Sequence, residues 1–241
     1  MCRIWDPLAR ALQDRYHIIA PDQRGHGDTS WPIDPDYSTD DYVADLAAFV
    51  EHLDVERFAL IALSMGGMNA IAYAAKHPQR VTSLVTIDIR LALDPDKRPN
   101  REQDKRTADT GHAIFPNLDG AFIARKFTRP HTPDSSIRHH VRHLLKQLPG
   151  GQWTNKHDPR VSYYWKPRNL WADLPNITAP VLIVRGGQSD VLPAEIAEQM
   201  RAALPKAELV TIEAAAHTVP EDQPQLFIDA VEAFLAKNPV S

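Results

Sequence analysis

A serine stands where an apolar run meets a glycine-containing turn. The residues Phe58 to Leu63 form a short apolar run, and the sequence Ala62-Leu-Ser-Met-Gly-Gly67 leads from it into small residues typical of a helix. A serine between a strand and a helix, with glycine two positions later, matches most of the G-x-S-x-G nucleophile elbow, and Ala62 replaces the first glycine. A helix N-cap would explain the same serine. The stretch predicts nucleophilic attack by the Ser64 hydroxyl.

A serine hydroxyl needs a base to take its proton, and the base needs an acid to hold its tautomer. His217 follows three alanines after an apolar run and precedes the last predicted helix. Asp190 ends Arg185-Gly-Gly-Gln-Ser-Asp190, just beyond another apolar run, and Asp88 follows the run Val81 to Ile87. We expect His217 as the base and Asp190 as the acid, with Asp88 as the rival. The non-catalytic alternatives are that His217 is a solvated loop histidine and that Asp190 caps the following helix.

The elements that must position these residues alternate along the chain. Ser38-Thr-Asp-Asp41 has the pattern of a capping box, so a helix is expected from there to about Leu53. Alternating strands and helices imply a mostly parallel sheet with helices on both faces. The strands expected are Tyr16–Ala20, Phe58–Leu63, Val81–Ile87, Val181–Val184 and Leu209–Ile212, and the helices expected later in the chain are Ala194–Leu204 and Pro224–Leu235.

The middle of the chain has a different composition. Residues 89–171 show no clear strand and carry 16 Lys and Arg against 8 Asp and Glu, together with six of the eleven histidines. This shift predicts an inserted helical cap at 89–171 on a core made of 1–88 and 172–241. The excess charge would attract carboxylate-bearing substrates, or it would simply be a solvated surface. The aromatic residues of this segment would line an apolar pocket or anchor the cap to the core; they are Trp153, Tyr163, Tyr164 and Trp165. Arg24 and His26 would reach a pocket or pack their own loop.

The motifs together resemble the α/β-hydrolase fold family, in its capped, esterase-like branch. The resemblance is carried by PDQRGHGDTS (Pro21 to Ser30), ALSMGG (Ala62 to Gly67), RGGQSD (Arg185 to Asp190) and AAAH (Ala214 to His217). It implies Ser64 as nucleophile, Asp190 as acid, His217 as base and the backbone N–H of Met65 as an oxyanion donor. It implies no metal or organic cofactor. The expected activity is hydrolysis of a small carboxylic ester or related acyl compound.

The resemblance to the family does not include the family's first strands and the loop that follows them. Members of the family open with three strands and a His-Gly loop that supplies a second oxyanion donor, whereas this sequence reads from the helix after that loop. We therefore expect that Met1 is not the natural start and that the fold is N-terminally incomplete. Carbon–carbon bond hydrolases and perhydrolases share the serine triad, and a non-catalytic ligand-binding or decayed hydrolase would lack the loop. All three stay open as alternatives.

Net charge, cysteine count and the length of apolar runs bear on the binding partners and the cellular location of the protein. The chain has 241 residues, a net charge of −4 and a pI near 6.2, so it has no overall attraction for nucleic acid or anionic membranes. It has one cysteine, Cys2, and no apolar run long enough for a membrane span or a signal peptide. The expectation is a cytoplasmic protein with a small-molecule substrate, whose oligomeric state the sequence leaves open.

Overall fold

The computed structural model describes residues 1–94, 96 and 100–239. By its internal contacts the chain divides into two compact units. The first comprises residues 1–37 and 95–165, and the second comprises residues 38–94 and 166–241. Each unit is described separately below.

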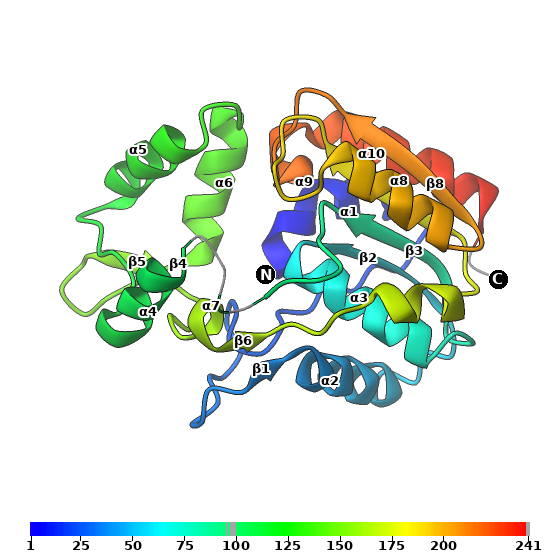
Figure 1. Ribbon diagram of the computed structural model, residues 1–241. Helices are drawn as coiled ribbons and strands as arrows, with labels where there is room; N and C mark the ends of the chain where they lie inside the picture. The colour runs from blue at the N-terminus through cyan, green and yellow to red at the C-terminus, as the bar shows by residue number, and fades with distance from the viewer. Residues whose placement is uncertain (95, 97–99, 240–241) are drawn as a thin grey trace. The chain divides into compact units, whose positions relative to one another are not determined.

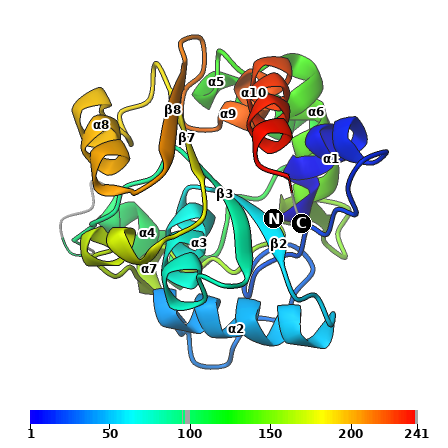
Figure 2. The ribbon, with the colours of Figure 1, turned by 90° about the vertical axis from the view of Figure 1, so that its right-hand side faces the viewer.

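The second unit is built on a four-stranded parallel sheet with the order β2-β3-β7-β8 (Figures 1 and 2). Its strands are β2 (Phe58–Leu63), β3 (Val81–Ile87), β7 (Val181–Gly186) and β8 (Ala207–Ile212). In the register Leu63 faces Ile87, Ile87 faces Val184, and Gly186 faces Ile212. The residues that follow β2, β3, β7 and β8 therefore emerge together at the carboxyl edge of the sheet.

Helices cover both faces of this sheet, as the alternating pattern predicts. Figure 2 shows α3 and α8 on one face and α10 on the other. Ser38 caps the helix at Thr39 in a complete capping box with Asp41, which confirms the predicted helix start. The helical elements of the unit are α2 (Thr39–His52), α3 (Met65–Lys76), the 3₁₀ helix η3 (Trp171–Asn176), α8 (Ala194–Ala203), α9 (Val219–Asp222) and α10 (Pro224–Lys237).

The first unit is mainly helical. Its core is an apolar cluster of Ala121, Ile137, Val141 and Leu145, against which Trp153 packs. Trp153 therefore packs within its own unit. The helical elements are η1 (Cys2–Trp5), α1 (Asp6–Leu12), α4 (Arg101–Thr110), α5 (Leu118–Thr128), α6 (Asp134–Leu144) and α7 (Val161–Tyr164).

Three features of this part of the chain differ from the sequence prediction. Residues 16–20 form no strand, because no neighbouring strand in the described chain pairs with them. Residues 89–171, expected to lack strands, contain the antiparallel hairpin of β4 (Leu145–Gln147) and β5 (Trp153–Asn155). The remaining short strands, β1 (Tyr37–Ser38) and β6 (Trp165–Lys166), also pair.

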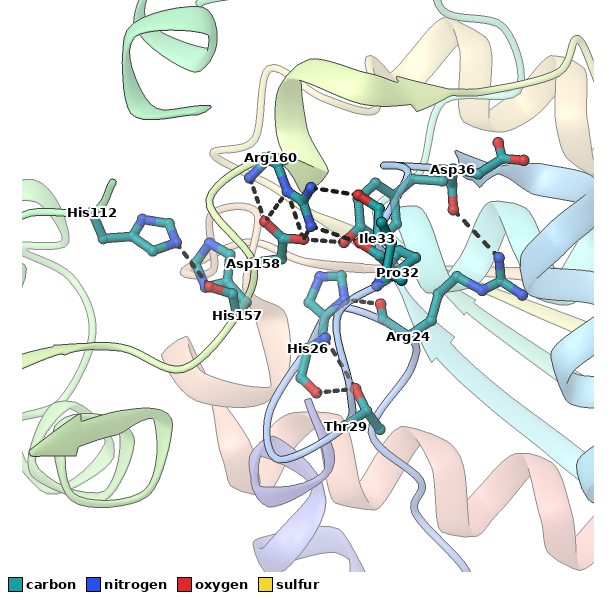
Figure 3. Close-up of polar contacts among 11 residues, drawn as sticks. Arg24, His26, Thr29, Pro32, Ile33, Asp36, His112, His157, Asp158 and Arg160 are labelled. Atoms are coloured by element: carbon teal, nitrogen blue, oxygen red, sulfur yellow. Dashed lines mark hydrogen bonds and ion pairs between the residues drawn. The ribbon is translucent and has the colours of Figure 1, made fainter. Parts of the chain in front are cut away.

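The third difference is that residues 1–37 group with residues 95–165, whereas residues 1–88 were all predicted to belong to the core. A buried network explains this grouping (Figure 3). Tyr37 donates a hydrogen bond to Asp158, and both side chains are fully buried. Arg160 binds the same carboxylate and also donates to the backbone carbonyls of Pro32 and Ile33. One buried carboxylate thus joins the loop at residues 22–37 to the segment around α7.

Candidate active site

Ser64 occupies a strained turn between β2 and α3. Its φ of 55° lies in the left-handed region, which a residue with a side chain rarely adopts. Its backbone N–H donates to the carbonyl of Ile87 at 2.9 Å, so the turn is held against the neighbouring strand β3. The strain presents the hydroxyl at the edge of the sheet.

Gly67 makes this turn possible because the chain is crowded there. A Cβ on Gly67 would lie 2.5 Å from the Ile89 side chain and 3.1 Å from the carbonyl oxygen of Ala62. Of the pair Gly66-Gly67, the second glycine is therefore the one that this crowding requires. Ala62, where the family pattern has its first glycine, is buried and fits.

His217 lies within hydrogen-bonding distance of Ser64 and of Asp88. Its Nε2 is 2.9 Å from the Ser64 hydroxyl, and its Nδ1 is 2.7 Å from Oδ2 of Asp88. The His217 side chain is 34% exposed, whereas Asp88 is fully buried. In this arrangement an imidazole with a proton on Nδ1 can accept the serine proton at Nε2.

The carboxylate beside His217 is Asp88, so the preference for Asp190 as the acid is wrong for this structure. Asp88 directly follows β3, which lies between β2 and β7, and so stands in line with Ser64. In the turn after β7, the Ser189 N–H bonds to the carbonyl of Gly186. Ser189 is buried and Asp190 exposed, and the backbone carbonyl of Asp190 accepts a hydrogen bond from Arg90. The turn thus directs the serine inward and the aspartate outward.

Asp88 accepts two further hydrogen bonds that sequence reasoning missed. The Ser189 hydroxyl donates to Oδ2 at 2.5 Å, and the backbone N–H of Gly186 donates to Oδ1 at 3.2 Å. Both donors belong to the RGGQSD stretch, whose last residue had been singled out instead. A buried carboxylate is costly unless it is hydrogen-bonded. The RGGQSD stretch, which was expected to supply the acid, therefore supplies two hydrogen-bond donors to Asp88 instead.

The loop that carries His217 is held close to the end of β7. A Cβ on Gly186 would lie 2.2 Å from the carbonyl oxygen of Ala216, so only glycine permits this approach. The backbone N–H of Ala216 donates to the buried carboxylate of Asp222 at 3.0 Å, from the short helix that follows. These contacts fix the backbone immediately before the imidazole.

Met65, expected as an oxyanion donor, is the first residue of α3. The first backbone N–H groups of a helix have no carbonyl partner within it, and the positive end of the helix dipole lies there. Met65 directly follows Ser64 in the chain, and its N–H has no carbonyl partner within α3. Such a donor can stabilise negative charge on a nearby oxygen.

Arg24 and His26 form contacts within their own loop (Figure 3). Arg24 donates to the carbonyl of Asp36 at 3.3 Å, and Nδ1 of His26 lies 3.0 Å from the carbonyl of Arg24. The His26 ring also stacks on His157 at 5.9 Å between centroids. Of the two roles considered for Arg24 and His26, these contacts favour packing of the loop.

Comparison with known proteins agrees with this fold. The model of the alpha/beta hydrolase fold family matches residues 2–224, and the chain belongs to this family. The esterase Rv0045c of Mycobacterium tuberculosis is 30% identical over 234 residues, covering 96% of this chain and 78% of that protein. The 2-(acetamidomethylene)succinate hydrolase of Mesorhizobium japonicum is 28% identical over 238 residues, covering 96% and 83%.

A solved structure is similar over almost the whole chain. The crystal structure of E-2-(acetamidomethylene)succinate hydrolase matches with a TM-score of 0.86 and 25% identity, covering 98% of this chain and 87% of that chain. These relatives are hydrolases, and they support hydrolase activity in general for this chain.

In the part of the chain that the structure describes, no helix has the length and apolar character needed to cross a membrane.

Proposed function

We propose that the protein is a serine hydrolase that cleaves a small carboxylic ester or related acyl compound through a covalent acyl-enzyme. The observation that carries this proposal is the hydrogen-bonded arrangement of Ser64, His217 and Asp88. Ser64 attacks the substrate carbonyl while His217 takes its proton at Nε2. Asp88 holds the Nδ1 proton and stabilises the imidazolium that forms.

The remaining steps use the same groups. Negative charge develops on the carbonyl oxygen, and the N–H of Met65 is one donor to it. The tetrahedral intermediate collapses when His217 gives its proton to the leaving alcohol, which leaves an ester on Ser64. Water, deprotonated by His217, then attacks that ester, and release of the acid restores the Ser64 hydroxyl.

A second candidate substrate class is an acyl compound that carries carboxylates. One relative is named as a hydrolase of a substituted succinate, and residues 89–171 have twice as many basic as acidic residues. The same serine chemistry would serve this class. Comparison of a neutral aryl ester with the aryl monoester of succinate separates the two classes. Only the succinate ester carries a carboxylate that the basic residues of 89–171 would attract. Carbon–carbon bond hydrolysis and perhydrolysis remain alternatives with the same nucleophile.

The test is covalent labelling combined with turnover. The purified chain is treated with a fluorophosphonate probe, and the modified residue is located by mass spectrometry. We expect labelling at Ser64 only, hydrolysis of a p-nitrophenyl ester of a short acid, and loss of both in Ser64→Ala. Heat-denatured protein and Ser135→Ala, which removes an exposed serine on α6 and keeps Ser64, are the controls. Labelling without turnover of any ester would favour a different acyl reaction, and folded protein that neither labels nor turns over would contradict the proposal.

A further inference from the structure

Two histidines and an aspartate in the first unit present their side chains to one another. His139 and His143 are one turn apart on α6, and Asp6 is the first residue of α1. One ligand atom from each residue can be chosen so that the three atoms lie within 4.8 Å of one another. Within residues 1–94, 96 and 100–239, this is the one group of three such side chains that could hold a metal ion.

The distances suit a small tetrahedral ion. Nε2 of His139 lies 3.3 Å from Oδ2 of Asp6. Two ligands bound to zinc at about 2.0–2.1 Å in a tetrahedron lie roughly 3.3 Å apart, so this pair already has the required separation. The rings of His139 and His143 are 4.5 Å apart between centroids. Small side-chain rotations would bring the third ligand into place.

The Oδ2 atom of Asp6 is the buried carboxylate oxygen of the group. Oδ2 of Asp6 is buried and accepts no hydrogen bond from the described residues, although the Arg3 guanidinium lies 3.0 Å from it. The Arg3 side chain is 46% exposed and can move into solvent, whereas the Asp6 side chain is only 17% exposed. A cation that binds in place of Arg3 would satisfy this oxygen.

The two histidines would contribute ring nitrogens as ligand atoms. His139 Nε2 lies 2.9 Å from the backbone carbonyl of Arg3, and this contact would have to be given up on metal binding. Two imidazoles and one carboxylate are a donor set that favours zinc and its neighbours over magnesium or calcium.

We infer that Asp6, His139 and His143 form a binding site for one zinc-type divalent ion, with a fourth position open to water. The ion would connect the start of α1 to α6, both within the first unit. The site shares no residue with Ser64, His217 and Asp88, and the inference does not depend on the proposed hydrolase activity.

The test measures zinc binding to the untagged chain after removal of metal by a chelator. Titration calorimetry with Zn²⁺ is expected to show one site per chain, and Mg²⁺ is expected not to bind. His143→Ala and Asp6→Asn should each weaken binding at least about tenfold, because one of three protein ligands is lost. Co²⁺ in place of Zn²⁺ should give the visible absorption of a tetrahedral site, and this absorption should be absent in His143→Ala.

Three further variants make the result independent of folding defects. His131→Ala removes an exposed histidine shortly before α6, and Cys2→Ser removes the single thiol, so both should bind Zn²⁺ as the parent does. Arg3→Gln removes the competing cation and should bind more tightly. The inference is overturned if the parent chain binds no Zn²⁺ at micromolar concentrations. It is also overturned if His131→Ala or Cys2→Ser weakens binding as much as His143→Ala does.

Discussion

At the scale of single residues, the structure distinguishes two aspartates that the sequence presents alike. Asp88 and Asp190 both follow parallel strands at the same edge, but only Asp88 is buried against His217. Asp88→Asn keeps the shape of the side chain and places an amide where His217 needs an acceptor for its Nδ1 proton. We expect kcat to fall by about 10³- to 10⁴-fold, with the fold retained.

Asp190→Asn is the matched variant for this prediction. It makes the same chemical change on an exposed side chain, so ester hydrolysis should stay close to that of the parent. Steady-state kinetics of both variants with one aryl ester measures the difference. Equal losses in the two variants, or a larger loss in Asp190→Asn, would contradict the assignment of Asp88.

Ser189 gives a second prediction at this scale. Its hydroxyl donates to the buried Asp88 carboxylate at 2.5 Å, and hydrogen bonds to charged groups contribute about 1.5–3 kcal/mol. Ser189→Ala should lower the free energy of unfolding by that order, as measured by urea denaturation. Ser135→Ala, an exposed serine on α6, should change it by less than about 0.5 kcal/mol. A stability loss no larger in Ser189→Ala than in Ser135→Ala would show that this hydrogen bond carries little stability.

At the scale of elements, apolar runs bounded by turn residues predicted the strands of the sheet well. Val81–Ile87 and Phe58–Leu63 match β3 and β2, since strands buried in a parallel sheet read as continuous apolar runs. The same signal fails at residues 16–20, because an apolar run forms a strand only where another strand pairs with it. The hairpin β4–β5 was missed because strands of three residues leave no detectable alternation.

The candidate site could be predicted only as far as the loops that carry it. Strand ends at one sheet edge placed Ser64 and His217 in reach of each other, because parallel strands share a direction. The choice of acid depends on which side chain of the turn after β7 faces inward, and that is set by the Ser189–Gly186 backbone hydrogen bond. The sequence pattern does not predict such a backbone hydrogen bond, although Ser189 directly precedes Asp190 and could have been considered as a hydrogen-bond donor.

The elbow between β2 and α3 supplies the prediction at the scale of elements. Gly67→Ala would place a methyl group 2.5 Å from the Ile89 side chain, so the helix or the turn must shift. Overpacking of this kind costs about 1–3 kcal/mol, and the shift would also move Ser64 relative to His217. Both stability and ester hydrolysis should decrease. Gly150→Ala, where the nearest atom is 3.8 Å away on a flexible glutamine, is the control that should change neither. Normal stability and activity in Gly67→Ala would mean that the elbow tolerates the extra methyl.

At the scale of the whole molecule, the basic excess of residues 89–171 is partly used within the first unit. Arg160 pairs with the buried Asp158, and Lys156 pairs with Asp28 at 2.9 Å. Burial alone would raise the pKa of Asp158, but hydrogen bonds from Arg160 and Tyr37 lower it, so this carboxylate stays charged. The excess therefore serves in part to hold the unit together, beside any attraction it exerts on substrates.

Two half-buried histidines, His26 and His157, give the first unit a pH dependence that the whole molecule should show. Burial lowers the pKa of His26 to about 4 and that of His157 to about 3, from an ordinary value of 6.5. Between pH 6.5 and 4 the unfolded chain binds protons that these folded rings do not bind, so stability must fall as the pH decreases. Each unit of pKa difference corresponds to about 1.4 kcal/mol, and the loss by pH 4 is expected to be on the order of 2–3 kcal/mol per histidine.

The measurement is the free energy of unfolding between pH 7.5 and 4, compared by slope rather than by absolute value. His157→Gln removes one titrating ring and its stacking, so it should lower stability at pH 7.5 and flatten the slope. His52→Gln, an exposed histidine at the end of α2, should leave the slope unchanged. If His157→Gln kept the slope of the parent, the acid sensitivity would have to come from groups outside the stacked histidines of the first unit.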